Sequence, residues 1–159
     1  MTKACGAAIA AVLVVSSAAR ADTVTQYSGV VESYGGVGGK IVIRTTKNST
    51  GHWDVDKKTL VKNAIKVNDW VSAWVIPSGH VVTLLSEQHA EPHAGVIKQV
   101  DKDGLSIASG TSTLKWTITS ATAFDGVARG ELRVGDNIGF NGYANNRYLA
   151  SVKLVRHAD

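Results

Sequence analysis

Two tryptophans, Trp70 and Trp74, stand four residues apart with Ser72 midway between them in the segment WVSAW. Alternate side chains of an extended strand point to the same side, so both indoles and the hydroxyl are expected on one sheet face. Indole rings stack on sugars, nucleobases and apolar side chains of partner proteins. Large aromatic side chains on a surface require an explanation. The spacing therefore predicts a ligand-binding face, and the alternative is packing against another part of the same chain.

A second group of candidate contact residues flanks the segment GYANNRY: Tyr143, Arg147 and Tyr148. The Asn-Asn pair is typical of a tight turn, which places both tyrosines at one end of a hairpin. We treat these three residues as a second ligand-binding patch, with ordinary hairpin packing as the alternative.

Histidines four residues apart, such as His89 and His93, meet on one face of a helix and are then suited to bind a metal. Pro92 lies inside this spacing, and proline disfavours a helix there. A complete site would also need a ligand from elsewhere, such as His80. We therefore interpret this segment as a solvated linker, assign no metal ligands and no cofactor, and leave metal binding by His89 and His93 as the alternative.

Catalytic motifs are missing from the sequence. It contains no nucleophilic serine flanked by glycines, no H-E-x-x-H and no phosphate-binding loop, because GGVGGK lacks the Ser or Thr that ends such a loop. Asp54 and Asp56 share a strand face, but no second pair of carboxylates can be placed opposite them. The sequence predicts a protein that is not an enzyme.

The strands that would position the candidate residues occur in two similar copies along the chain. Each copy contains about five short apolar runs separated by glycine-bearing turns, a pattern typical of strands. The matching segments are SGVVESYGGVGGKIVI with AGVIKQVDKDGLSI, HWDV with KWTI, IKVNDWVSAWV with LRVGDNIGFNG, and GHVVTLL with RYLASVK.

The turn before the fourth strand carries Asn68 in the first copy and Gly135 in the second. Asparagine and glycine tolerate a left-handed backbone best, so both copies are expected to turn sharply there. A ligand-contacting loop is the alternative interpretation.

Strand alternation predicts which side of each sheet faces inward. In the second copy Ile138 and Phe140 share one face and asparagines 137 and 141 the other, which must be the outer face because asparagine is seldom buried without partners. Transferred to the first copy, this pattern directs Val71, Ala73 and Val75 into the core and the tryptophans outward. Trp53 and Trp116 alternate in phase with apolar neighbours, so we expect one central indole in each core.

Helical spacing is confined to DKKTLVKNAIKV, whose counterpart contains two glycines. We therefore expect at most one short helical turn per copy. The predicted fold is all-β, with two tandem small five-stranded OB-like barrels.

With these elements in place, the chain resembles secreted bacterial families of unknown function that are built from tandem small OB-like β-barrel repeats. The resemblance rests on the Gly-x-Val openings, the Val-Gly-Asp turn and the final strand LASVKLV, and it covers most of residues 27–155. The first copy departs from the pattern at Asn68 and in GGVGG. The resemblance implies a fold and leaves the function open.

The N-terminus predicts export. Residues 1–21 contain a charged start, a short apolar run and an Ala-x-Ala ending, which indicate a signal peptide cleaved after Ala21. The apolar run is shorter than the about 20 residues that cross a bilayer, so we expect no membrane span. We divide the remainder into a first barrel at 22–88, a linker at 89–93 and a second barrel at 94–159, in a periplasmic or secreted protein.

Charge gives little information about partners. The 17 basic and 13 acidic residues give a net charge of +4, which falls to +2 once Lys3 and Arg20 leave with the signal peptide. So small an excess does not indicate a nucleic-acid-binding protein.

We therefore predict an exported, non-catalytic binding or envelope-associated module that contacts protein or cell-envelope glycan through the Trp70/Trp74 face. One alternative is binding of single-stranded nucleic acid by the OB-like barrels. Lysines and Arg44 would then supply positive charge near the site. Another is a structural, surface-exposed antigen without a ligand. The oligomeric state is left open.

Overall fold

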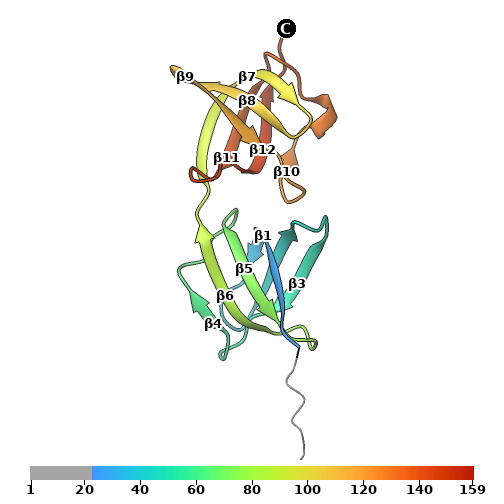
Figure 1. The fold of residues 1–159 in the computed structure, drawn as a ribbon, viewed down its shortest axis with the longest axis vertical. Helices are drawn as coiled ribbons and strands as arrows, with labels where there is room; N and C mark the ends of the chain where they lie inside the picture. The colour runs from blue at the N-terminus through green and yellow to red at the C-terminus, as the bar shows by residue number, and fades with distance from the viewer. Residues whose placement is uncertain (1–22) are drawn as a thin grey trace, which may run out of the picture.

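The computed structural model describes residues 23–159, which form two six-stranded β-sheets stacked along the long axis of the molecule (Figure 1). The predicted signal peptide lies outside the described residues. The first sheet contains β1 Thr25–Tyr34, β2 Lys40–Thr45, β3 Thr50–Asp54, β4 Leu60–Lys62, β5 Trp70–Val75 and β6 Val81–Gln88. The second contains β7 Glu91–Asp101, β8 Gly104–Ser109, β9 Ser112–Thr117, β10 Ala123–Asp125, β11 Asn137–Gly142 and β12 Leu149–Arg156, with a 3-10 turn, η1, at Arg129–Glu131.

Both sheets have the same strand order, β3-β2-β1-β5-β6-β4 in the first and β9-β8-β7-β11-β12-β10 in the second. A parallel bridge between Asp54 and His80 joins β3 to the start of β6, and a bridge between Thr117 and Tyr148 does the same in the second sheet. These bridges close each set of five main strands into the Greek-key barrel of an OB-like fold. The prediction of an all-β chain with two tandem OB-like barrels is confirmed.

Each barrel has a sixth, three-residue strand that the sequence did not predict. In the first barrel this strand, β4, lies in the tract with helical spacing, and it pairs in parallel with β6. The Thr59 hydroxyl donates to the Val81 carbonyl at 2.6 Å and the Asn63 amide to the Ser86 carbonyl at 2.8 Å, so both ends of β4 are tied to β6. These tertiary bonds override the helical periodicity of the tract. Within residues 23–159, the only helical turn is η1, and no helix there is long and apolar enough to cross a membrane.

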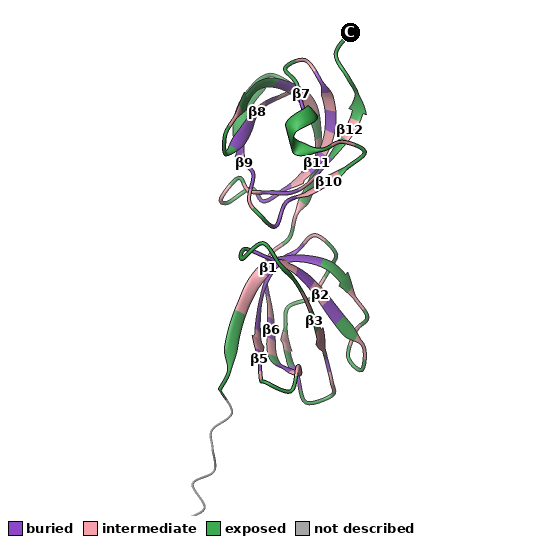
Figure 2. Cartoon of the chain, turned by 90° about the vertical axis from the view of Figure 1, so that its right-hand side faces the viewer, coloured by how far each residue is buried: buried purple, intermediate pink, exposed green. Residues whose placement is uncertain are grey.

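The buried side chains form one core inside each barrel. Figure 2 marks the buried residues in purple along the strands of both barrels. Val71, Ala73 and Val75 lie in the first core, and Ile138 and Phe140 lie in the second, as the alternation predicts. Trp116 is buried in the second core, and Trp53 packs half-buried against the first.

The predicted left-handed turns are confirmed, with φ of 69° at Asn68 and 95° at Gly135. Their amides donate to the carbonyls of Val31 and Ile97, each at 2.8 Å. Glycine is required in the two Gly-Val openings for another reason, because the neighbouring strand lies too close to leave room for a side chain. A Cβ atom at Gly29 would collide with the Arg44 carbonyl oxygen, and one at Gly95 would collide with that of Ala108.

Two residues, His89 and Ala90, separate β6 from β7. Residues 91–93, which the sequence assigned to the linker, form the start of β7. The domain bounds 22–88 and 94–159 stay a prediction.

Candidate functional site

The outer face of the β1–β5–β6 sheet carries both tryptophans that the sequence singled out. Trp74 stands opposite Gln26 on β1 and Thr83 on β6, and its indole is half-buried. Between the two tryptophans, Ser72 stands opposite Ser28. The predicted outward side of β5 is therefore correct, but its three side chains have different surroundings.

Ser72 is covered, with an exposed fraction of 1%. Its hydroxyl oxygen lies 2.8 Å from that of Ser28 and accepts a bond from the Gln26 amide at 3.3 Å, and its proton goes to the Glu87 carboxylate. Ser72 is thus not open to a ligand, contrary to the expectation of an accessible hydroxyl. It holds Gln26 and Glu87 in place, and these two residues are exposed.

Trp70 packs against the second barrel. Its ring meets those of Tyr143 and Tyr148 edge-on, at centroid distances of 6.0 and 6.1 Å. Trp70 and Tyr148 pack against a buried cluster that consists of Val30 from the first barrel and Ala121, Tyr143 and Ala150 from the second, all 0% exposed. For Trp70 the alternative interpretation, packing within the chain, is the one that the structure supports.

Polar contacts reinforce this interface between the barrels. Arg44 donates through Nε to the Ala121 carbonyl at 3.1 Å, and the Ser120 hydroxyl donates to the Thr46 carbonyl at 2.8 Å. The Tyr143 hydroxyl donates to the Asn68 carbonyl. Each barrel therefore contributes both donors and acceptors to the contact.

Of the second predicted patch, only Arg147 is exposed. Tyr143 is fully buried and cannot meet a ligand, and Tyr148 is half-buried beside Trp70. Burial and, to a lesser extent, the negative charge of Asp69 raise the pKa of Tyr143, which remains a neutral hydrogen-bond donor. The structure therefore places Trp70, Tyr143 and Tyr148 in the interface between the barrels, puts Ser72 and Trp74 on the outer face of β1–β5–β6, and leaves Arg147 exposed.

The sequence interpretation missed a buried carboxylate paired with a histidine in each barrel. Asp69 is 1% exposed and lies 2.8 Å from His89 Nδ1, and Asp136 is 0% exposed and lies 3.2 Å from His157 Nδ1. The Lys66 and Arg133 amides donate to these carboxylates at 2.8 and 2.9 Å. A signal was present in the sequence, because both histidines precede an alanine and an acidic residue at matching places in the repeats.

These carboxylates hold each left-handed turn against the strand that ends beside it. Burial raises the pKa of the Asp136 carboxyl, but the Ala158 and Arg133 amides and the His157 ring outweigh this effect, so its pKa lies below the ordinary value. In the first barrel, the ring of His89 pairs with the Asp69 carboxylate. His93 instead stacks on Phe140 at 5.2 Å, so the two linker histidines have separate partners.

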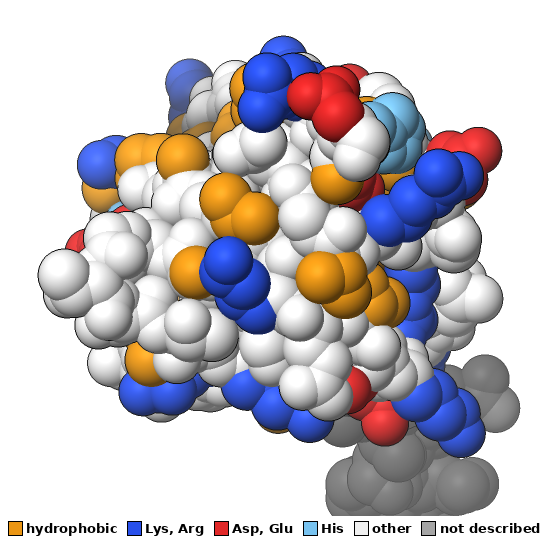
Figure 3. Space-filling view, turned by 90° about the horizontal axis from the view of Figure 1, so that it is seen from above, with side chains coloured by type: hydrophobic (Ala, Val, Ile, Leu, Met, Phe, Trp, Pro, Cys, Tyr) orange, Lys and Arg blue, Asp and Glu red, His pale blue; other side chains and the backbone are white. Residues whose placement is uncertain are grey.

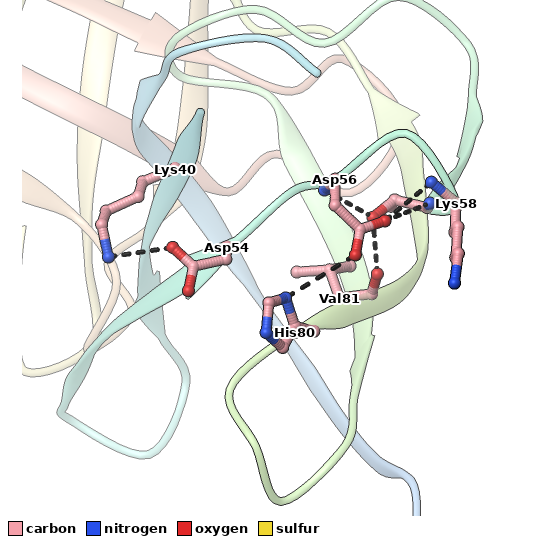
Figure 4. A network of polar contacts seen from close by, with 7 residues as sticks. Lys40, Asp54, Asp56, Lys58, His80 and Val81 are labelled. Carbon is pink, nitrogen blue, oxygen red and sulfur yellow. Dashed lines mark hydrogen bonds and ion pairs between the residues drawn. The ribbon is translucent and has the colours of Figure 1, made fainter. Parts of the chain in front are cut away.

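A surface network of the first barrel occupies the carboxylates that could otherwise act as ligands (Figure 4). Asp54 binds Lys40 at 2.9 Å, a contact that lowers the pKa of Asp54. Asp56 accepts the Lys58 amide at 2.7 Å and lies 3.7 Å from His80. Across residues 23–159, no three His, Cys, Asp or Glu residues are grouped so that they could hold a metal ion.

No protein-family model and no curated protein sequence matches this chain. Among solved structures, it is similar to Ag(I)CusF, with 23% identity, coverage of 42% of this chain and 97% of that chain, and a TM-score of 0.35. It is also similar to apo-CusF residues 6-88 from Escherichia coli, with 24% identity, coverage of 45% and 95%, and a TM-score of 0.35. A third match is drosophila Unr CSD456, with 15% identity, coverage of 83% and 62%, and a TM-score of 0.36. The fold assignment rests on the strand order and register of the chain itself.

Proposed function

We propose that the chain is a non-catalytic binding module whose ligand contacts the outer face of β1–β5–β6 around Trp74. We call this surface the Trp74 face, and it consists of Gln26, Ser28, Trp74, Thr83 and Glu87. The observation that supports it is a half-exposed indole beside a fixed row of amide, hydroxyl and carboxylate groups. Trp70 is excluded from this face because the second barrel covers it.

The chemistry of the Trp74 face favours a carbohydrate. A sugar ring presents a flat apolar side to an aromatic ring and carries hydroxyl groups around its rim. Ligand sites in proteins commonly combine an aromatic surface with a few fixed polar groups. Gln26 and Glu87 are both oriented through Ser72, so a donor and an acceptor stand ready beside the indole. The predicted signal peptide favours export, so we take cell-envelope glycan as the class of carbohydrate.

Nucleic acid suits this face less well. The Glu87 carboxylate would repel phosphate groups, and the nearby Lys47 already lies over the Tyr27 ring, 5.9 Å from its centroid. Arg44 stands opposite Val30, which in turn stands opposite Trp70, and its guanidinium is used at the barrel interface. Binding of single strands predicts an affinity that falls steeply with added salt, whereas stacking on a neutral sugar does not.

A titration followed by intrinsic fluorescence and calorimetry tests the proposal. N-acetylglucosamine oligomers and a soluble peptidoglycan digest are the carbohydrate probes, and a single-stranded oligothymidylate is the comparison. We expect carbohydrate binding that Trp74→Ala abolishes, that Trp74→Phe retains in weakened form, and that is insensitive to salt. Leu114→Ala, which removes an exposed apolar side chain of the second barrel, is the control. Equal binding by wild type and Trp74→Ala would contradict the proposal, as would salt-sensitive binding to the oligonucleotide alone.

A further inference from the structure

The two core tryptophans rest on different strands of their barrels. In the first barrel the six-membered ring of Trp53 occupies the place that a Cβ atom of Gly51 would take, two residues earlier on β3. In the second barrel the ring of Trp116 occupies the place that a Cβ atom of Gly142 would take, at the end of β11. Each indole therefore lies against a glycine, but the two glycines belong to strands that do not correspond.

Strand pairing shows that the two copies exchange glycine and side chain at these positions. The counterpart of Gly51 in the second barrel is Leu114, and the counterpart of Gly142 in the first barrel is Val75. Each barrel thus has a side chain where the other has the glycine beneath its indole. Neither indole can adopt the position of the other, because a Cβ atom there would collide with its ring.

The place that corresponds to the ring of Trp116 is a cavity in the first barrel. The cavity has a volume of about 320 Å³, and its walls include Trp53, Tyr27 and Val75. Their counterparts are the residues that form and surround the indole of the second barrel, namely Trp116 itself, His93 at a centroid distance of 5.5 Å, and Gly142. The same strand framework therefore holds a ring in one barrel and an open space in the other.

A second exchange keeps this space open. Phe140 meets Trp116 edge-on with 5.1 Å between the ring centroids, and Trp116 is 5% exposed. The counterpart of Phe140 is Ala73, and Trp53 is only half-buried. Tyr27 lies against Trp53 at a centroid distance of 4.6 Å and an angle of 37°. Two aromatic rings of the first barrel are thus available to an occupant of the cavity.

The lining of the cavity favours an uncharged occupant. Besides the aromatic pair, it consists of Thr23, Thr25, Val75, Ile76, Pro77 and Gly79. None of the described residues that line the cavity has a charged side chain, so a charged ligand would lose its hydration without gaining a partner. A cavity of about 150 Å³ accommodates benzene, so one of about 320 Å³ has room for a two-ring molecule.

The cavity lies at the end of the first barrel that faces away from the second. β1 begins at this end and β5 finishes there (Figure 1). Figure 3 shows the opposite end of the molecule, where apolar side chains lie among Lys and Arg side chains, a setting less suited to an uncharged ring. Val75 belongs to the core side of β5 and Trp74 to its outer side, so the cavity is separate from the Trp74 face.

We infer that this cavity binds a small, uncharged, planar aromatic molecule of about the size of indole. The ligand takes the place that the ring of Trp116 fills in the second barrel and stacks against Trp53 and Tyr27. The hydroxyls of Thr23 and Thr25 can accept a hydrogen bond from its N–H or O–H group. This inference does not depend on the proposed function, because the two sites lie on opposite sides of β5.

Nuclear magnetic resonance of isotope-labelled protein tests the inference, with indole itself as the probe. We expect indole to shift the side-chain N–H signal of Trp53 and the amide signals of Thr25 and Ile76, and to leave the side-chain N–H signals of Trp74 and Trp116 in place. Indole-3-acetate carries the same ring with a charge and should bind at least tenfold more weakly. N-acetylglucosamine oligomers, the probes of the Trp74 face, should not compete with indole.

Thr25→Phe places a ring of the protein itself in the cavity and should weaken indole binding at least tenfold. Thr25 is exposed at the start of β1, so this variant should fold, which circular dichroism would check. Thr113→Phe adds the same ring at an exposed position of β9 and is the control. Trp74→Ala should bind indole as wild type does.

A double variant, Gly51→Leu with Val75→Gly, gives the first barrel the arrangement of the second. The indole of Trp53 should then turn onto β5 and fill the cavity, so that added indole no longer binds. A wild type whose Trp53 signal does not move up to the solubility limit of indole would overturn the inference, as would shifts at Trp74 in place of Trp53. Equal indole binding by wild type and folded Thr25→Phe would also overturn it.

Discussion

Replacing Tyr143 with alanine should uncouple the two barrels. Tyr143 is fully buried, but it lies in the cluster shared between the barrels and outside either barrel core. Its ring meets Trp70, and its hydroxyl donates to the Asn68 carbonyl of the first barrel. The substitution therefore removes the central apolar contact and one polar contact of the interface, while both cores keep their side chains.

The expected loss follows from these two contacts. Truncating a buried aromatic residue to alanine costs about 3–5 kcal/mol when the surroundings stay in place. The lost hydrogen bond adds about 1 kcal/mol. An interface can separate and let water in, which a closed core cannot, so the stabilisation actually lost is limited to the coupling between the barrels. Tyr143→Phe keeps the ring and should lose only about 0.5–1.5 kcal/mol for the hydrogen bond.

Differential scanning calorimetry distinguishes coupling from core stability. We expect one unfolding transition for wild type and Tyr143→Phe, and two for Tyr143→Ala, because the barrels then unfold separately. Phe140→Ala is the matched control, since it truncates an aromatic residue 4% exposed inside the second core and leaves the interface unchanged. A single transition in Tyr143→Ala, shifted no more than in Tyr143→Phe, would refute the assignment of Tyr143 to the coupling of the barrels.

Two further predictions concern the turn that is repeated in both barrels. The pKa of Asp136 is lowered in the folded state, so its charge stabilises the fold above the unfolded pKa of about 4 and that stabilisation is lost as pH falls through the folded value. Thermal unfolding between pH 7 and pH 3 should therefore depend less on pH in Asp136→Asn, and equal dependence would contradict the assigned contacts. Asn68 has a φ of 69°, so Asn68→Ala should destabilise by about 1–2 kcal/mol in urea unfolding, whereas Asn68→Gly should be nearly neutral. Equal losses in the two variants would show that the side chain of Asn68, and not its backbone conformation, is what matters.

The sequence was sufficient to predict the barrels because their determinants are local or periodic. Alternation identified Val71 and Phe140 as core residues, and the Asn/Gly exchange at positions 68 and 135 identified the left-handed turns. The short strand β4 was missed because its pairing with β6 depends on hydrogen bonds from Thr59 and Asn63, and neither bond leaves a periodic signal.

The candidate site was predicted less well because exposure depends on what docks on a face. Alternation correctly directed Ser72 outward, but neighbouring side chains cover it. Tyr143 and Trp70 lie far apart in the sequence, and no pattern in either copy indicates that one barrel end packs on the other. The pairing of Asp69 with His89 was overlooked because the repeat was matched only as far as its last strand.

The differences between the two copies are of two kinds. At the positions of Trp70 and Arg44, the second copy has Asn137 and Ala108, and this difference is accounted for by a contact that only the first copy makes within the chain. Trp74 and its counterpart Asn141 differ as much, yet Trp74 belongs to neither core and does not pack in the interface cluster. Since folding alone does not require an indole at position 74, as the second barrel demonstrates, we propose that this indole serves a ligand on the Trp74 face.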